Sequence, residues 1–362
     1  MKIPFLDLKE INKPYFSALE SVSTVIQSGW YIMGQEVESF ENAYATYCES
    51  DYCIGVSNGL DAIILLLEAC NFPKGSEILV PSNTYIATIL GILRAGHVPV
   101  LVEPNEETYL IELANLEEKI SKQTKAVFFV ELYGQTGNLA PMSEFCRQHN
   151  LKFFCDAAQS HGVRYQNQRS TRWYDGVAHS FYPTKNLGAL GDAGAVTTQD
   201  SDLAQKVRTL RNYGSSQKYV FDSIGLNARL DELQAHILLK KLPFLDQENE
   251  IRKEIAKRYL LEIKNPSIIL PKLLQDSVWH LFVIRTQDRA GLQQYLLNLG
   301  IGTDIHYPIP PHQQKATQSW LSGQYPISEK LHQHVLSIPL HPRLETTQVD
   351  YIIDSLNEWK KN

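Results

Sequence analysis

The chain has 362 residues, of which 43% are hydrophobic and 20% charged, so it is long enough for two domains and does not have the composition of a disordered protein. Its formal net charge is −6 and its basic residues are scattered, so a nucleic-acid partner is not expected. Five cysteines without a C-x-x-C pair predict neither a disulfide framework nor a metal site.

The N-terminal segment MKIPFLDLKEINKPYF mixes charges with apolar residues, which is not the pattern of a secretory signal. The apolar runs are too short to span a bilayer. We therefore expect a cytoplasmic protein without a membrane partner.

Between residues 50 and 210, short apolar runs alternate with helical patterns. This order predicts an α/β fold with a mainly parallel sheet that helices cover on both faces. The expected strands are 53–56, 77–80, 98–102, 126–130, 151–155 and 176–181, and the expected helices include 61–70, 86–94 and 142–149. A large domain would cover residues 1–245, although its first 20 or so residues could pack elsewhere.

The rest of the chain has a different pattern. A long helical stretch after Arg229, interrupted at Pro243, indicates that the chain leaves the sheet near residue 245. A smaller domain, 246–362, would contain strands 278–285, 302–306 and 335–338 and helix 289–299. In the last helix, apolar residues at 349, 352, 353, 356 and 359 share one face, so we expect that face to lie in the core.

Two charged residues follow predicted strands of the large domain. Asp156 comes directly after strand 151–155, and Lys185 follows strand 176–181 and precedes a glycine-rich segment. Open α/β sheets bind ligands at the carboxyl ends of their strands. A lysine that holds an aldehyde covalently and a carboxylate that keeps a pyridine nitrogen protonated are the pair that pyridoxal phosphate (PLP) chemistry needs. The pair predicts a PLP enzyme. Alone, a lysine is more often a surface cation, and an aspartate after a strand is about as often a helix cap or turn residue.

Three stretches resemble the signatures of the sugar-nucleotide aminotransferases, the DegT/StrS group of fold-type-I PLP enzymes. They are DAAQSHG from Asp156, SFYPTKNLGALGDAGA from Ser180 and GLNARLDELQA from Gly225. Further matches near Ser28 and His306 extend the resemblance over nearly the whole chain. It implies an aspartate aminotransferase-like fold, with a large PLP-binding domain and a smaller C-terminal α/β domain.

A phosphate site is expected where strand 53–56 turns through Asn58-Gly59 into a helix. Free backbone N–H groups and the positive end of the helix dipole point toward such a site, although a plain connection has the same pattern. Many family members have a threonine where Leu60 stands. The resemblance therefore implies that the N–H groups of Gly59 and Leu60 bind the phosphate, helped by the hydroxyl of Ser180.

The resemblance assigns three more residues to the cofactor. Tyr85 would stack on the pyridine ring, and Gln159 would donate a hydrogen bond to the phenolic oxygen of the ring. Asn227 would reach the phosphate of the neighbouring subunit's cofactor, which implies a homodimer with composite active sites. From the sequence alone, a core position for Tyr85 is the less favoured alternative to stacking, whereas Asn227 is equally consistent with a turn residue before a helix.

The implied reaction moves an amino group from L-glutamate to a keto sugar in two half-reactions on Lys185. KNLG followed by GDAGA is similar to enzymes that act on 3-keto sugars, and RNYGSSQKY from Arg211 resembles the branch that aminates dTDP-3-keto-6-deoxyhexoses. The product would be a dTDP-3-amino-3,6-dideoxyhexose of the galacto or gluco series, for a lipopolysaccharide O-antigen or an S-layer glycan. The candidate substrate residues are Tyr182, Lys218, Tyr219, His306 and Tyr307.

Four other functions share some of these sequence features. A 4-keto sugar-nucleotide aminotransferase and a non-catalytic PLP-binding regulatory protein both stay open. A PLP-dependent sugar 3-dehydratase of this family has histidine in place of the Schiff-base lysine. This chain has Lys185 there, which argues against that function. A nicotinamide-binding oxidoreductase is disfavoured because Gly188, Gly191 and Gly194 do not have the G-x-G-x-x-G spacing after a strand.

Overall fold

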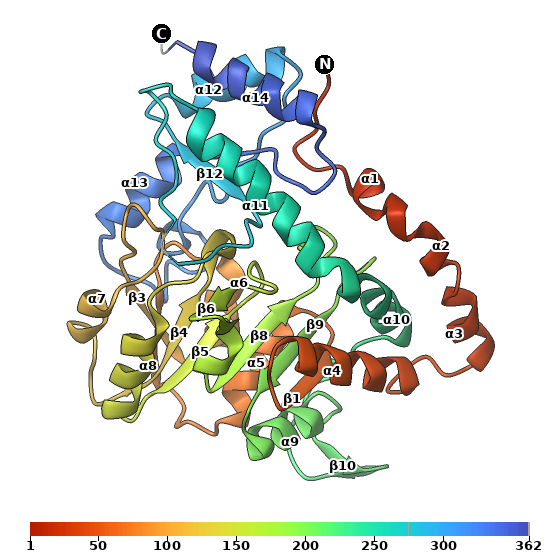
Figure 1. The fold of residues 1–362 in the computed structure, drawn as a ribbon. Helices are drawn as coiled ribbons and strands as arrows, with labels where there is room; N and C mark the ends of the chain where they lie inside the picture. The colour runs from red at the N-terminus through yellow and green to blue at the C-terminus, as the bar shows by residue number, and fades with distance from the viewer. Residues whose placement is uncertain (274, 361–362) are drawn as a thin grey trace.

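The centre of the molecule is a seven-stranded sheet covered by helices (Figure 1). The structure is a computed structural model that describes residues 1–273 and 275–360. The sheet order is β1-β9-β8-β5-β4-β2-β3, in which β9 runs antiparallel to both of its neighbours and the other paired strands are parallel. The strands are β1 (Tyr52–Val56), β2 (Glu77–Pro81), β3 (Val98–Val102), β4 (Thr124–Val130), β5 (Lys152–Asp156), β8 (Gly176–Ser180) and β9 (Gly194–Thr198). The predicted mainly parallel α/β fold is confirmed.

Both faces of the sheet are buried. Along β4, Ala126 and Phe128 belong to one core cluster, whereas Val127 and Phe129 belong to another, as the alternation of side chains along a strand requires. The first cluster is shared with α5 (Gly59–Ala69), α6 (Ile86–Arg94) and α9 (Ser201–Leu210). On the other face lie α8 (Leu139–Gln148), α4 (Gln35–Tyr47) and α10 (Glu232–Lys241). Burial on both faces explains why the strands appear in the sequence as unbroken apolar runs.

A separate core lies in the C-terminal part of the chain. It joins α11 (Leu245–Glu262), β12 (Phe282–Arg285), α12 (Arg289–Asn298), β13 (Val335–Ile338) and α14 (Thr346–Glu358). The apolar face of the last helix is buried there, as predicted. Ile3 also belongs to this core, because its backbone exchanges hydrogen bonds with Gly300 and Gly302. In Figure 1, α11 runs from α10 toward the end of the molecule where both termini lie. The domain boundary near residue 245 stays a prediction.

Shorter elements complete the chain. The helices are α1 (Leu8–Asn12), α2 (Phe16–Leu19), α3 (Val22–Ser28), α7 (Leu113–Glu117) and α13 (Pro326–His334). The 3-10 turns are η1 (Lys13–Tyr15), η2 (Leu132–Gly134), η3 (Ser170–Trp173), η4 (Leu242–Phe244) and η5 (Pro311–Gln313). Two hairpins join β6 (Arg164–Tyr165) to β7 (Gln168–Arg169) and β10 (Ser215–Gln217) to β11 (Val220–Phe221). Within the described residues, no helix is both long and apolar enough to cross a membrane. The cytoplasmic location stays a prediction.

Two strand predictions were wrong. Residues 302–306 form no strand, because Gly302 donates its N–H to Ile3 while Asp304 forms a single bridge with Ser337. The expected strand 278–285 begins only at Phe282, because its first residues bond elsewhere. The N–H groups of Val278 and Leu281 donate to the carbonyl oxygens of Gly134 and Tyr133, over 2.8 and 3.3 Å. This irregular stretch contains His280, which lines a cavity at the carboxyl ends of β5 and β8.

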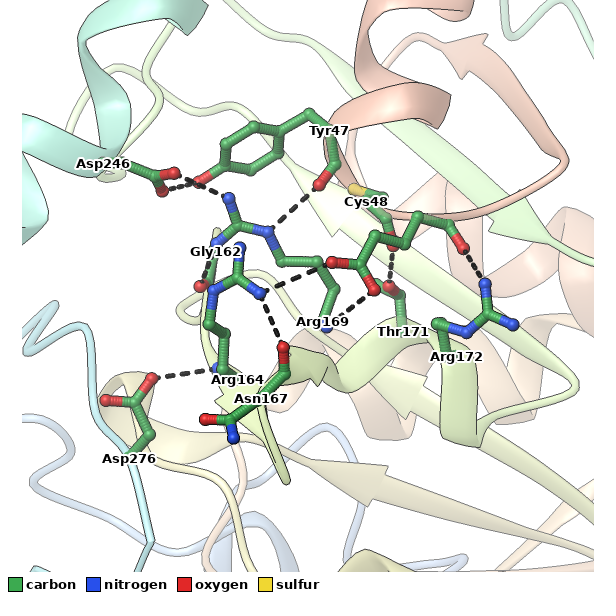
Figure 2. Close-up of polar contacts among 11 residues, drawn as sticks. Tyr47, Cys48, Gly162, Arg164, Asn167, Arg169, Thr171, Arg172, Asp246 and Asp276 are labelled. Atoms are coloured by element: carbon green, nitrogen blue, oxygen red, sulfur yellow. Dashed lines mark hydrogen bonds and ion pairs between the residues drawn. The ribbon is translucent and has the colours of Figure 1, made fainter.

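The β6–β7 hairpin holds the first turn of α11 and the segment before β12 against the large domain (Figure 2). Arg169 lies over the ring of Tyr47 at 4.0 Å and donates to the Asp246 carboxylate over 2.7 Å. The Tyr47 hydroxyl donates to the same carboxylate over 2.5 Å. The backbone N–H of Arg164 donates to Asp276 over 2.9 Å. These contacts fix the position of two segments that reach the active site from the C-terminal part of the chain.

Candidate active site

A cavity of about 550 Å³ lies at the carboxyl ends of β5 and β8, beside the first turn of α5. This is the place where open α/β sheets bind ligands, and the volume suits a cofactor or small ligand. Most of the predicted site residues line it. They are Gly59, Leu60, Tyr85, Asp156, Gln159, Ser180, Tyr182, Lys185, His306 and Tyr307.

Lys185 lies in a tight turn after β8. Its N–H donates to the carbonyl oxygen of Tyr182 over 2.8 Å. A Cβ on Gly188 would lie 2.4 Å from the carbonyl oxygen of Pro183, so the turn requires glycine there. Burial lowers the pKa of Lys185 to about 8, while the nearby Asp156 carboxylate opposes that shift. A lowered pKa increases the fraction of free amine, which is the nucleophilic form.

The Asp156 carboxylate is held from two sides. Thr88 of α6 donates its hydroxyl to Oδ2 over 2.8 Å, and the N–H of Ala158 donates to Oδ1 over 3.1 Å. Burial raises the pKa of Asp156, and this effect outweighs the two hydrogen bonds and the attraction of Lys185. The hydrogen bonds and Lys185 do not offset the cost of burying the charge of this carboxylate. The carboxylate therefore suits a bound cation, such as a protonated pyridine nitrogen.

The first turn of α5 can accept an anion. The side chain of Asn58 accepts the N–H of Asp61 over 2.8 Å, which leaves the N–H groups of Gly59 and Leu60 without an acceptor among the described residues. A Cβ built on Gly59 would lie 2.6 Å from Cβ of Ser180, so only glycine lets the Ser180 hydroxyl come this close. Two free N–H groups and one hydroxyl at a helix N-terminus fit a phosphate. The residues present therefore fit PLP at both of its ends.

Gly59→Ala is expected to weaken PLP binding by about tenfold or more, because the added Cβ must displace Ser180 or the start of α5. Titration of the apo-protein with PLP, followed by absorbance, measures the change. Leu60→Ala is the matched control, since it keeps the same backbone N–H group and should change the affinity by less than about threefold. Equal affinities for Gly59→Ala and the wild type would remove this turn from the phosphate site.

Gln159 is anchored beside two tyrosines. Its side-chain oxygen accepts the N–H of Tyr133 over 2.6 Å, and its amide nitrogen donates to the Tyr307 hydroxyl over 3.0 Å. The Tyr85 ring lies 4.9 Å from the Tyr307 ring and is half exposed. Tyr85 therefore has a ring face available at the cavity, and the amide nitrogen of Gln159 has a second hydrogen to donate. The specific roles of these residues toward PLP stay predictions.

Three predicted residues lie outside the lining of this cavity. Asn227 forms a backbone bridge with Asn212, and neither residue lines the cavity. Lys218 and Tyr219 lie at the tip of the β10–β11 hairpin, which projects from the body of the molecule in Figure 1. Tyr219 is 82% exposed. Within one chain, the structure does not bring these residues to the cofactor cavity.

Other residues of the site were not predicted. Thr88 follows Tyr85 by three residues, and helical spacing could have placed both on one side of α6. His280 lines the cavity, but its position inside an expected strand gave no signal. Asp192 also lines the cavity. Within the described ranges, no cluster of three or more His, Cys, Asp or Glu side chains is arranged to hold a metal ion.

Comparisons with known proteins agree with this geometry. The chain is 48% identical over 360 residues, 99% of either chain, to a dTDP-3-amino-3,6-dideoxy-alpha-D-galactopyranose transaminase of Aneurinibacillus thermoaerophilus. The crystal structure of S. venezuelae DesV superposes with a TM-score of 0.96 at 40% identity, covering 99% of this chain and 98% of DesV. The structure of NtdA from Bacillus subtilis with bound cofactor PMP has a TM-score of 0.92 at 32% identity, covering 98% of this chain and 84% of NtdA.

The model of the DegT/DnrJ/EryC1/StrS aminotransferase family matches residues 16–357. A match of this extent, together with a cavity whose residues fit both ends of PLP, confirms the predicted enzyme class and cofactor. The chain is a PLP-dependent member of the DegT/DnrJ/EryC1/StrS aminotransferase family.

Proposed function

We propose that this protein transfers the amino group of L-glutamate to the C3 keto carbon of a dTDP-linked 3-keto-6-deoxyhexose, giving a dTDP-3-amino-3,6-dideoxyhexose. The observation that supports it most is the meeting of Lys185 and Asp156 in one cavity, where a nucleophilic amine faces a buried carboxylate. The name of the 48% identical relative supports amination at C3 and a galacto configuration. The choice of glutamate rests on the family signatures.

The positions of the residues support the following roles. Bound PLP supplies an electron sink for the carbon that loses its proton. Asp156 would hold the proton on the pyridine nitrogen, and Gly59, Leu60 and Ser180, which line the same cavity, would hold the phosphate. Lys185, as a free amine, takes the proton from the α-carbon of the amino donor.

The sugar would bind at the outer part of the cavity. Tyr182 is about half exposed and lines the cavity together with His306 and Tyr307, which come from the C-terminal part of the chain. The Nδ1 atom of His306 lies 2.9 Å from the Ser337 hydroxyl, and burial lowers the pKa of His306. A neutral histidine beside Tyr307 offers hydrogen bonds to sugar hydroxyl groups without adding charge.

The proposal is tested with the purified protein. L-Glutamate alone should convert the PLP absorbance to that of the pyridoxamine form and release one equivalent of 2-oxoglutarate. The aminated protein should then return to the PLP form with a dTDP-3-keto-6-deoxyhexose, and both C4 epimers should be compared. A faster return with a 4-keto sugar nucleotide would favour the 4-amino alternative. No conversion by any amino donor would favour a regulatory protein.

We propose further that the functional unit is a homodimer with composite sites. Asn227 and Lys218 do not reach the cavity of their own chain, which is expected if they serve the partner's site. Large apolar side chains are exposed on the segment after α3, on the β10–β11 hairpin and just after that hairpin, which is unusual for a monomer. These side chains are Trp30, Tyr31, Ile32, Met33, Tyr219, Val220, Phe221 and Ile224.

Mixing two inactive variants tests the composite site. A Lys185→Ala chain and an impaired Asn227→Ala chain should regain activity together, because in a mixed dimer both lesions fall in one site and the other site is intact. Random exchange would restore about a quarter of the wild-type rate, since about half of the dimers are mixed and each has one good site of two. Mass spectrometry verifies the exchange. Mixed dimers without activity would mean that each site is built within one chain.

A further inference from the structure

Two buried asparagines connect the residue after Lys185 to the C-terminal part of the chain. Asn186 is 5% exposed and Asn249 of α11 is 2% exposed. The Asn249 amide nitrogen lies 2.9 Å from the carbonyl oxygen of His161, and its oxygen lies 2.9 Å from the Asn186 nitrogen. The same Asn186 nitrogen lies 3.0 Å from the carbonyl oxygen of Val278. The Asn186 oxygen lies 3.1 Å from Nδ1 of His280.

The direction of every hydrogen bond in this series is determined. Backbone carbonyl oxygens can only accept, so the atom of Asn249 beside the His161 carbonyl must be its NH₂ group. The other side-chain atom of Asn249 is then an acceptor, and the atom of Asn186 beside it must be a donor, as the Val278 carbonyl also requires. The remaining atom of Asn186 is an oxygen. His280 must therefore donate from Nδ1, which makes Nδ1–H its tautomer.

The opposite nitrogen of His280 is free to accept a hydrogen bond. Nε2 has no hydrogen-bond partner among the described residues and is not one of the buried unpaired atoms, while His280 lines the same cavity as Lys185. Burial lowers the pKa of His280 well below its usual value, and the positive charges of Lys185 and Arg252 lower it further. The imidazole is therefore neutral near pH 7, and Nε2 carries a lone pair that no described residue uses.

We propose that His280 is a positioning residue for Lys185, whose free amine donates a hydrogen bond to Nε2 of His280. This inference rests on the proposed function only in so far as Lys185 moves the proton. A carboxylate in this place would stabilise the ammonium form of the lysine, whereas a neutral imidazole orients one N–H bond and leaves the lone pair of the amine free to take a proton. Asn186 and Asn249 keep the imidazole in the tautomer that can do this.

The two segments that carry Asn249 and Val278 are each hydrogen-bonded to the β6–β7 hairpin. Asp246, one turn before Asn249 in α11, receives the hydrogen bonds from Arg169 and Tyr47 that Figure 2 shows. Asp276, two residues before Val278, accepts the backbone N–H of Arg164. Both segments that hold His280 in place are thus fixed to the large domain, which contains Lys185.

Nitrogen NMR of the holoenzyme labelled with ¹⁵N-histidine tests the tautomer directly. The signal of His280, assigned by its loss in His280→Gln, should show a protonated Nδ1 and an unprotonated Nε2 at pH 7.5. Asn186→Ala and Asn249→Ala should each shift this signal toward the other tautomer or an average of both. An imidazolium, or an Nε2–H tautomer in the wild type, would overturn the proposal. If one asparagine variant does not fold, the wild-type spectrum and the other variant still decide.

Kinetics test the effect on Lys185. His280→Phe should slow the glutamate half-reaction roughly 10- to 100-fold with little change in KM, because the amine loses its orientation but the binding residues stay. His280→Gln, whose side-chain oxygen can take the place of Nε2, should recover the rate to within about fivefold of the wild type. A wild-type rate in His280→Phe, or a glutamine variant as slow as phenylalanine, would overturn the role. If the wild type itself does not react with glutamate, the proposed function fails, while the NMR result stands separately.

Discussion

Lys185→Ala is expected to lower transamination by roughly 10⁴-fold or more, because the variant loses both the amine that binds PLP and the base that moves the proton. In the wild type, borohydride reduction followed by peptide mapping should find the pyridoxyl group on Lys185. The variant should still bind PLP noncovalently, since the helix N-terminus, Ser180 and Asp156 are unchanged.

The chain contains a matched internal control for this experiment. Lys241 is also buried, and burial lowers its pKa to about 8, as for Lys185. It does not line the cavity, and its amine donates to Asn12 over 2.9 Å and to the carbonyl oxygen of Gly188. A lowered pKa alone would predict labelling of both lysines, whereas the cavity predicts labelling of Lys185 alone. A pyridoxyl label on Lys241 would contradict the assignment.

Asp156→Asn is expected to retain PLP but to lower turnover by at least about a hundredfold, because an amide cannot hold the proton on the pyridine nitrogen. The shape of the side chain and the hydrogen bond from Thr88 are largely preserved, so a folding defect is not expected. The measurement is the rate constant of the glutamate half-reaction, with bound PLP followed by absorbance.

Thr88→Val provides a graded comparison for that variant. It keeps the carboxylate but removes one of its two hydrogen bonds, so turnover should fall only several-fold. The wild type should be fastest, Thr88→Val slower and Asp156→Asn slowest. Turnover near the wild-type value in Asp156→Asn would show that this carboxylate does not control the cofactor.

The sequence by itself determined the sheet and the pair of residues, Asp156 and Lys185, at the carboxyl ends of two of its central strands. Strand β5 is buried on both faces and contains an apolar run, and the residues at the ends of β5 and β8 had to meet at one edge of a mainly parallel sheet. Asp156 and Lys185 were predictable for this reason. The Asn-Gly turn before α5 was likewise a local signal, because it depends on neighbours in the chain.

Tertiary structure alone decided the surroundings of that pair. Thr88 reaches Asp156 across 68 residues of chain, and Asn186 meets Asn249 and His280 across 63 and 94 residues. The segment 278–281 was expected to be a strand, but it bonds to the loop at Tyr133 and Gly134 and thereby brings His280 to the cavity. Local periodicity records which face of an element is buried, not which distant element covers it. Contacts between buried polar groups of different elements depend on how the cores pack together, and that packing exists only in the folded chain.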